Sequence, residues 1–129
     1  MEKKIEDIIS YEIVGAAIEV HKALGPGLLE SVYESSLCHE LLLRGLVVQR
    51  QLIVPVKYKD CIVKAPLCLD IVVGNKVIVE VKATEVMHSI HKTQLLTYLK
   101  LTNLRLGMLI NFGQNCVKDG ICRVVNQIY

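Results

Sequence analysis

Aromatic residues are scarce in this chain: among 129 residues there is no tryptophan and a single phenylalanine. Proteins that bind single-stranded nucleic acid by stacking need several exposed rings, so this composition argues against a stacking platform. The five cysteines are an odd number and no two are spaced as CxxC, which argues against both a disulfide framework and a zinc site. We therefore expect reduced cysteines, buried as small hydrophobic residues.

Long hydrophobic runs and a signal peptide are also missing. No apolar stretch approaches the roughly 20 residues that cross a bilayer, and the first ten residues, MEKKIEDIIS, are rich in charge. The sequence therefore predicts a cytoplasmic protein that does not enter a membrane. A net charge of +2 neither indicates nor excludes a phosphate-rich partner. With 52% hydrophobic residues, the chain should bury one core, and we expect one domain over residues 1–129.

The order of helical and strand patterns predicts an α+β, or mixed-sheet α/β, domain. Gly25-Pro26-Gly27 should end the first helix, and Pro55 indicates a sheet edge or a bulge. The expected helices cover residues 4–24, 28–44 and 89–101, and the expected strands cover residues 46–58, 61–66, 67–73, 76–82, 105–112 and 120–129.

Three of the charged residues in the hairpin LCLDIVVGNKVIVEVKA, namely Asp70, Glu80 and Lys82, lie within its otherwise apolar strands. Alternation places Glu80 and Lys82 on one face of their strand. A two-residue turn would put Asp70 on the other face, whereas the three-residue loop 74–76 places Asp70 opposite Glu80. The longer loop, with Gly or Asn at positive φ, is the register we predict because it leaves one face wholly apolar. That face would consist of Leu69, Ile71, Val73, Val77, Val79 and Val81.

Two carboxylates directly opposite each other in a sheet repel one another. A divalent cation between them would remove the repulsion, because hard cations prefer carboxylate oxygens. Lys82 could then bind a phosphate or orient a water, which suits metal-assisted hydrolysis of a phosphodiester. The residues alone leave a second interpretation equally open, in which Asp70, Glu80 and Lys82 form a structural charged cluster at the sheet surface.

Asp70, followed after nine residues by the string EVK, resembles the signature of the PD-(D/E)XK nuclease superfamily. The string GPGLLESVYE, which contains Gly27, Glu30 and Tyr33, is similar to the motif that names the GxxExxY protein family. The string HKTQLLTYLK resembles the glutamine-containing helix motif of RecB-like nucleases. The resemblance extends over residues 10–126. It implies a restriction-endonuclease-like core, in which a mixed β-sheet flanked by helices carries a metal site.

The resemblance also implies roles for the charged residues. Asp70, Glu80 and the backbone carbonyl of Val81 would bind Mg²⁺ or Mn²⁺. Lys82 would position or activate the attacking water, or stabilise developing charge. Glu30, on the second helix, would bind the metal directly or through a water.

Further residues are expected around the site. Gln94 completes the set of candidate catalytic residues. It lies one helical turn from Tyr98, and both would support the acids or touch the nucleic-acid backbone. Tyr33 should pack in the core with its hydroxyl hydrogen-bonded near the site. His91 either reaches the same cleft or is an exposed helix residue. His21 either caps the C-terminus of the first helix, the alternative we favour, or belongs to the site.

One segment departs from the family. The residues before Asp70 read LCLD, where the family often carries an aromatic residue and an arginine. The lack of this arginine either weakens phosphate binding or is compensated by Lys64 or Lys92.

The resemblance implies a metal-dependent nuclease with DNA, rather than RNA, as the favoured substrate. The main alternative is a catalytically inactive nuclease-fold module that binds nucleic acid or protein. A third is a structural domain that dimerises through the strand edge near Pro55. Buried acids without a function are destabilising, so the intact acid set counts against the third. The sequence leaves a monomer and a homodimer open.

Overall fold

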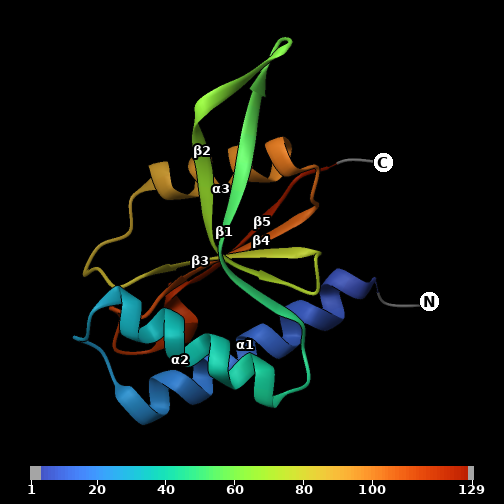
Figure 1. Ribbon diagram of the computed structural model, residues 1–129. Coiled ribbons are helices and arrows are strands. Elements are labelled where there is room, and N and C mark those ends of the chain that lie inside the picture. The colour runs from blue at the N-terminus through green and yellow to red at the C-terminus, as the bar shows by residue number, and fades with distance from the viewer. Residues whose placement is uncertain (1–3, 128–129) are drawn as a thin grey trace.

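The computed structural model describes residues 4–127. Its strands form one five-stranded sheet in the order β1-β2-β3-β4-β5, in which β3 and β4 are parallel and the other neighbours are antiparallel. The elements are α1 (Ile5–Leu24), α2 (Glu30–Leu43), β1 (Val48–Tyr58), β2 (Cys61–Val73), β3 (Val77–Lys82), α3 (Ser89–Thr102), β4 (Leu106–Asn111), the short 3-10 helix η1 (Val117–Gly120) and β5 (Ile121–Val125). The expected mixed sheet flanked by helices is therefore present (Figure 1).

Most expected elements form close to their predicted bounds, apart from the start of β2. α1 ends at Leu24 because Gly25 takes a φ of 72°, which ends the helix as predicted. The short helix η1 was not expected. The last two residues of the strand predicted over 120–129 lie outside the described residues. Within residues 4–127, no helix combines the length and apolarity needed to cross a membrane.

Two hydrophobic clusters pack the helices onto the sheet. The larger one packs α1 and α2 against one face, with Ile13, Leu37 and Val79 fully buried. The smaller one packs Leu95 and Leu99 of α3 against the other face. All six residues of β4 are buried, as expected for a strand next to a parallel partner and covered on both faces.

The hairpin between β2 and β3 has the predicted register. Val73 pairs with Val77 across a three-residue loop, in which Gly74 and Asn75 take φ values of 60° and 55°. The expected apolar face is wrong at Leu69, which packs with α3 in the smaller cluster while Val73 and Val77 belong to the larger one. Ile71 already belongs to the larger cluster, so the alternation along β2 breaks between Leu69 and Ile71.

β1 and β2 form a ribbon that continues well beyond the helices (Figure 1). Residues 61–66, expected as a separate short strand, run directly into residues 67–73 as one strand of 13 residues. β1 is an edge strand, and its register with β2 shifts between Val54 and Val56. Both observations confirm the edge and bulge predicted at Pro55.

The expectation of buried cysteines is wrong for most of them. All five are free, and Cys38 is buried, but Cys61, Cys68 and Cys116 are exposed. Cys61 and Cys68 lie on the ribbon, where few residues have a neighbouring element to cover them. Composition alone does not show which strands leave the core.

Candidate active site

Asp70 and Glu80 meet where β2 and β3 separate. Regular pairing of these strands runs from Val73 to Ile71 and stops there. Beyond it, the N–H of Asp70 donates to Oε2 of Glu80 and the N–H of Val81 donates to Oδ2 of Asp70, both at 2.9 Å. Each carboxylate therefore accepts a hydrogen bond from the strand that carries the other acid. The structure thus brings the two predicted acids together.

Burial raises the pKa of both acids. Glu80 is 6% exposed, and burial followed by the charge of Asp70 raises its pKa from 4.5 to about 8. The pKa of Asp70 is also raised by burial; the N–H of Val81 acts in the opposite direction, and the charge of Glu34 adds to the rise. Two buried like charges favour uptake of a proton or of a cation. The pair is therefore costly to ionise without a positive partner.

Lys82 and His91 lie next to this pair. The Lys82 side chain is half-buried, and its positive charge opposes the rise in the pKa of Glu80. Burial, then the charges of Lys82 and His88, lower the pKa of His91, which favours its neutral form. Its buried Nδ1 has no hydrogen-bond partner among the described residues. Of the two alternatives for His91, a place at the cleft is therefore the one the geometry supports.

Tyr98 and Gln94, the other predicted site residues of α3, differ in how far they are buried. Tyr98 is half-buried, and burial followed by the charges of Glu80 and Asp70 raises the pKa of its hydroxyl. Tyr98 therefore lies close to the acids. Gln94 is exposed, and within residues 4–127 it forms no side-chain hydrogen bond. The predicted role of Gln94, in supporting the acids or contacting the nucleic-acid backbone, stays a prediction.

Glu30 lies near the acids without joining them. It is the first residue of α2, it is exposed, and it shares with Asp70 a pocket of about 530 Å³. In the part of the chain that the structure describes, no three His, Cys, Asp or Glu side chains are close enough together to hold a metal ion. Direct binding of one ion by Glu30, Asp70 and Glu80 is therefore not built into the structure. The other predicted alternative, contact through a water, stays a prediction.

Three polar residues beside Asp70 were missed by the sequence analysis. Glu34, one helical turn after Glu30, is buried and accepts hydrogen bonds from Nε of Arg50 at 2.6 Å and from Nε2 of Gln51 at 2.8 Å. Gln51 has a φ of 53°, which is strained for a residue other than glycine. The signal was the polar run QRQ inside an otherwise apolar strand, together with the glutamate that ends GPGLLESVYE.

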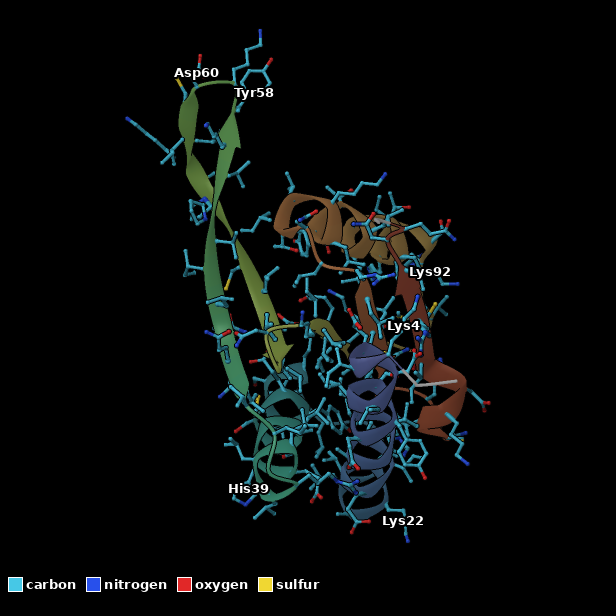
Figure 2. All side chains as sticks on the ribbon, turned by 90° about the vertical axis from the view of Figure 1, so that its right-hand side faces the viewer. Lys4, Lys22, His39, Tyr58, Asp60 and Lys92 are labelled. Atoms are coloured by element: carbon cyan, nitrogen blue, oxygen red, sulfur yellow. The ribbon has the colours of Figure 1, made fainter. Side chains whose placement is uncertain are left out.

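Arg50, rather than Lys64 or Lys92, takes the place of the missing family cation beside Asp70. Arg50 and Asp70 line the same pocket, and the Arg50 side chain is 42% exposed. Lys64, one of the two predicted replacements, lies on the projecting part of the ribbon. Lys92, the other, is an exposed residue of α3 (Figure 2). Neither lysine lines that pocket.

Tyr33 braces the loop that leads into α2. Its ring is fully buried and stacks on Phe112 at a centroid distance of 4.7 Å. Its hydroxyl donates to the carbonyl of Gly25 and accepts from the N–H of Leu28 at 3.1 Å. The predicted core position is confirmed, and the hydroxyl orients the loop that precedes Glu30.

Replacing Tyr33 with phenylalanine should therefore destabilise the protein. The change leaves the ring in place but removes both hydrogen bonds, which should lower the free energy of unfolding by about 1–3 kcal/mol. Urea denaturation followed by circular dichroism measures the difference. Tyr11→Phe is the matched control, since Tyr11 is 77% exposed and should tolerate the change. Equal stability of both variants would show that the hydroxyl contributes nothing.

His21 lies in the last turn of α1, as the favoured alternative expects, and its ring makes a further contact with another part of the chain. Its Nε2 donates to the carbonyl of Gln114 at 2.8 Å, and its ring lies 6.2 Å from that of Phe112. His21 therefore ties the end of α1 to the loop after β4. It neither caps its own helix through the ring nor contacts the acids.

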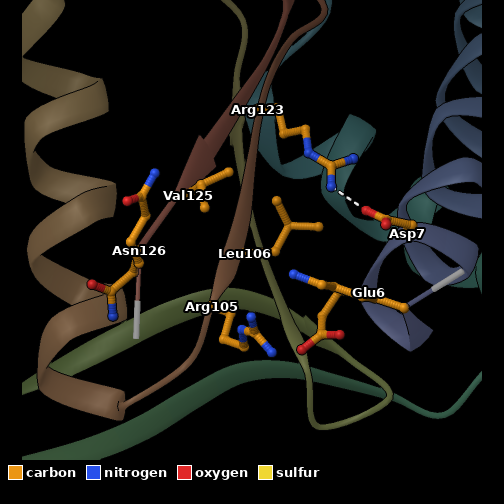
Figure 3. A pocket seen from close by; sticks show the side chains of 9 residues that line it. Glu6, Asp7, Arg105, Leu106, Arg123, Val125 and Asn126 are labelled. Atoms are coloured by element: carbon orange, nitrogen blue, oxygen red, sulfur yellow. Dashed lines mark hydrogen bonds and ion pairs between the residues drawn. The ribbon is translucent and has the colours of Figure 1, made fainter. Parts of the chain in front are cut away.

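A second pocket lies away from the acids, between the start of α1 and the strands β4 and β5 (Figure 3). It has a volume of about 250 Å³, and its charges of both signs include the ion pair between Asp7 and Arg123. None of the predicted site residues lines this pocket.

The donor atoms of the acid pair fit a hard divalent cation. Mg²⁺ is commonly bound by one or two carboxylates, with waters and substrate phosphates completing its shell. Asp70 and Glu80 supply two carboxylates on adjoining strands, and burial raises the pKa of both, so a positive charge between them would favour their ionised forms. A two-carboxylate site of this kind needs no third acidic side chain.

Comparison with known proteins agrees with this geometry. A family model described as the PD-(D/E)XK nuclease superfamily matches residues 7–124, which include every residue of the acid site. No curated protein and no solved structure matches the chain in the same comparisons. Nucleases of this superfamily generally use divalent metals and act on nucleic acid, and the GxxExxY likeness stays a prediction. The chain belongs to the PD-(D/E)XK nuclease superfamily, and its three helices and mixed sheet form a restriction-endonuclease-like core.

Proposed function

We propose that the protein is a divalent-metal-dependent nuclease that hydrolyses phosphodiester bonds in DNA. The observation that carries the proposal is the pair Asp70 and Glu80, hydrogen-bonded to each other's strands and buried enough to raise the pKa of both. A buried pair of like charges is destabilising, so a chain that keeps one needs a use for it. Binding a cation is the use that the donor atoms support.

The metal-binding residues would be Asp70, Glu80 and the carbonyl of Val81. A bound Mg²⁺ or Mn²⁺ supplies Lewis acidity toward the phosphate and lowers the pKa of a bound water. Glu30, across the pocket, would hold a water near the acids. Lys82 would donate to a phosphate oxygen or to the attacking water.

The residues of α3 would act around this centre. The Nδ1 of His91, which has no partner within residues 4–127, would accept a hydrogen bond from a water near Lys82. Tyr98 would limit access of bulk water to the acids because its ring packs in the cluster under α3. Gln94 would contact the nucleic-acid backbone, since its amide is exposed.

Arg50 would hold a phosphate next to the reacting one. Its Nε is bound to buried Glu34, which fixes the plane of the guanidinium. Within residues 4–127, its two terminal nitrogens form no hydrogen bond. A guanidinium that is held at one edge presents its other edge to a phosphate. Arg is better suited to this geometry than Lys.

Replacing Arg50 with glutamine should therefore raise KM for DNA and lower kcat/KM by roughly 10–100-fold, as expected for a lost charge-assisted hydrogen bond. Steady-state cleavage of a labelled duplex measures both constants. Arg44→Gln is the matched control, because Arg44 also pairs with a glutamate of α2, at 3.0 Å from Glu40, but at the other end of the helix. If both variants have the KM of the wild type, Arg50 holds no phosphate.

A catalytically inactive binding module is the second candidate. It is favoured by one observation: no third His, Cys, Asp or Glu joins the acids among the described residues. The experiment that separates the two functions is cleavage of plasmid DNA with Mg²⁺ or Mn²⁺, compared with the same reaction in EDTA. Ion-dependent cleavage supports the nuclease, whereas binding of DNA without cleavage supports the module.

A further inference from the structure

The outer part of the ribbon, residues 55–66, projects from the body of the protein and is called the arm below (Figures 1 and 2). Every residue from 57 to 66 is exposed, including Tyr58 and Ile62, at 64% and 71%. A two-stranded hairpin without a third strand or a covering helix is marginally stable in water. The arm therefore has the form of a segment that is covered by something other than its own chain.

The arm has a basic face and an apolar face. Lys57 pairs with Ile62, and residues opposite each other in a ribbon share a face, so Lys64 joins them by alternation. Lys59 lies in the turn at the tip. The other face carries Val56, Tyr58, Cys61 and Val63. Three lysines therefore face solvent on the arm against one acid, Asp60.

The arm is continuous with the acid site. β2 carries Lys64 on the arm and Asp70 at its base, six residues apart, which is at most about 20 Å along an extended strand. Duplex DNA advances about 3.4 Å for each base pair, so this distance corresponds to roughly six base pairs. The major groove of B-DNA, about 12 Å wide, admits a two-stranded β-ribbon.

We propose that the arm binds duplex DNA: it lies in the major groove several base pairs from the acids, and its lysines contact the flanking phosphates. The choice of DNA as the polyanion rests on the proposed function. A second copy of the chain fits the arm less well. The lysines of two arms would repel each other, and Pro55 and Pro66 remove two of the N–H groups that edge-to-edge pairing needs.

The test measures binding without cleavage. In a Glu80→Gln background with EDTA, anisotropy of a fluorescein-labelled 20-base-pair duplex is followed from 50 to 300 mM salt. The triple variant Lys57→Gln, Lys59→Gln, Lys64→Gln should bind about tenfold or more weakly at 50 mM salt. Three lost phosphate contacts should also make the slope of log K against log salt shallower by roughly 2.7. The matched control neutralises three exposed lysines elsewhere, Lys76, Lys100 and Lys118, and should leave the slope unchanged.

Three results would overturn the inference. The first is an equal slope for the arm variant and the control. The second is equal dependence on the arm for duplex RNA, whose deep and narrow major groove does not admit a ribbon. The third is that the wild type sediments as a dimer and the arm variant as a monomer, while both bind DNA equally tightly. Arm-dependent binding by a wild type that does not cleave would overturn the proposed nuclease alone, whereas cleavage with arm-independent binding would overturn the arm alone.

Discussion

Glu80→Gln and Lys82→Gln are each expected to lower the rate of Mg²⁺-dependent DNA cleavage by roughly 10²–10⁴-fold, the range of effects for groups that act directly on the reaction. The glutamine at 80 keeps the shape of the side chain and can still accept from the N–H of Asp70, but it loses the charge that would bind the ion. The glutamine at 82 removes the ammonium whose charge opposes the rise in the pKa of Glu80. Initial rates of nicking of supercoiled plasmid, with Mg²⁺ or Mn²⁺, measure both effects.

The controls for these variants lie close by in the sequence. Glu85→Gln and Lys76→Gln change the same residue types at exposed positions and should keep the wild-type rate. Circular dichroism should show the same fold for all four variants. If Glu80→Gln cleaves as fast as the wild type, the reaction does not use the acid pair and the proposed site is wrong.

The stability of the metal-free protein should fall as the pH rises from about 5 to 8, and Glu80→Gln should remove most of this fall. The pKa of Glu80 is about 8 in the folded protein, against 4.5 for an ordinary glutamate. Between these values the folded state keeps a proton that the unfolded state has lost, so raising the pH favours unfolding. At pH 8 in EDTA, the variant should be more stable than the wild type by roughly 2–4 kcal/mol, a rise in Tm on the order of 10 °C.

Divalent cations should make the wild type more stable than Glu80→Gln, the reverse of the order expected in EDTA. An ion that binds the folded state raises Tm by mass action, so Mg²⁺ or Mn²⁺ should stabilise the wild type and leave Glu80→Gln nearly unchanged. Thermal melts at pH 5, 6.5 and 8, with EDTA or with added ion, give the full comparison. Glu85→Gln should follow the wild type throughout. A wild type whose Tm is insensitive to both pH and ion would contradict the account of the acid pair.

The site depends on a local break in the sheet. Asp70 and Glu80 can replace main-chain acceptors because β2 and β3 stop pairing at Ile71. On the other side of Asp70, Gln51 takes a strained positive φ and turns its amide to Glu34. Backbone strain of this kind persists only where surrounding contacts impose it. Here those contacts are the hydrogen bonds from the Gln51 amide to buried Glu34. The break also lets β2 leave the core and continue into the arm.

Much of the fold follows from the sequence because the relevant interactions are local. Helical spacing of apolar residues and the glycine after Leu24 predict α1 and its end, which depend on contacts within a few residues. The register of the hairpin is also local: only the three-residue loop gathers the valines of both strands on one face, apart from the displaced Leu69. The convergence of Asp70 and Glu80 follows directly from that register, because a single hairpin loop joins the two strands that carry these acids.

The remaining features of the site involve residues that lie far apart in the chain. Whether Glu34 or Glu30 lies nearer the strands depends on how α2 packs on the sheet, and the partner of Glu34 is Arg50, on a different element. The length of the free arm depends on where α3 stops covering β2. These features are set by packing between elements, whose energies no short segment of sequence contains. The acids and their register therefore follow from local sequence, whereas the residues that surround them depend on how distant elements pack together.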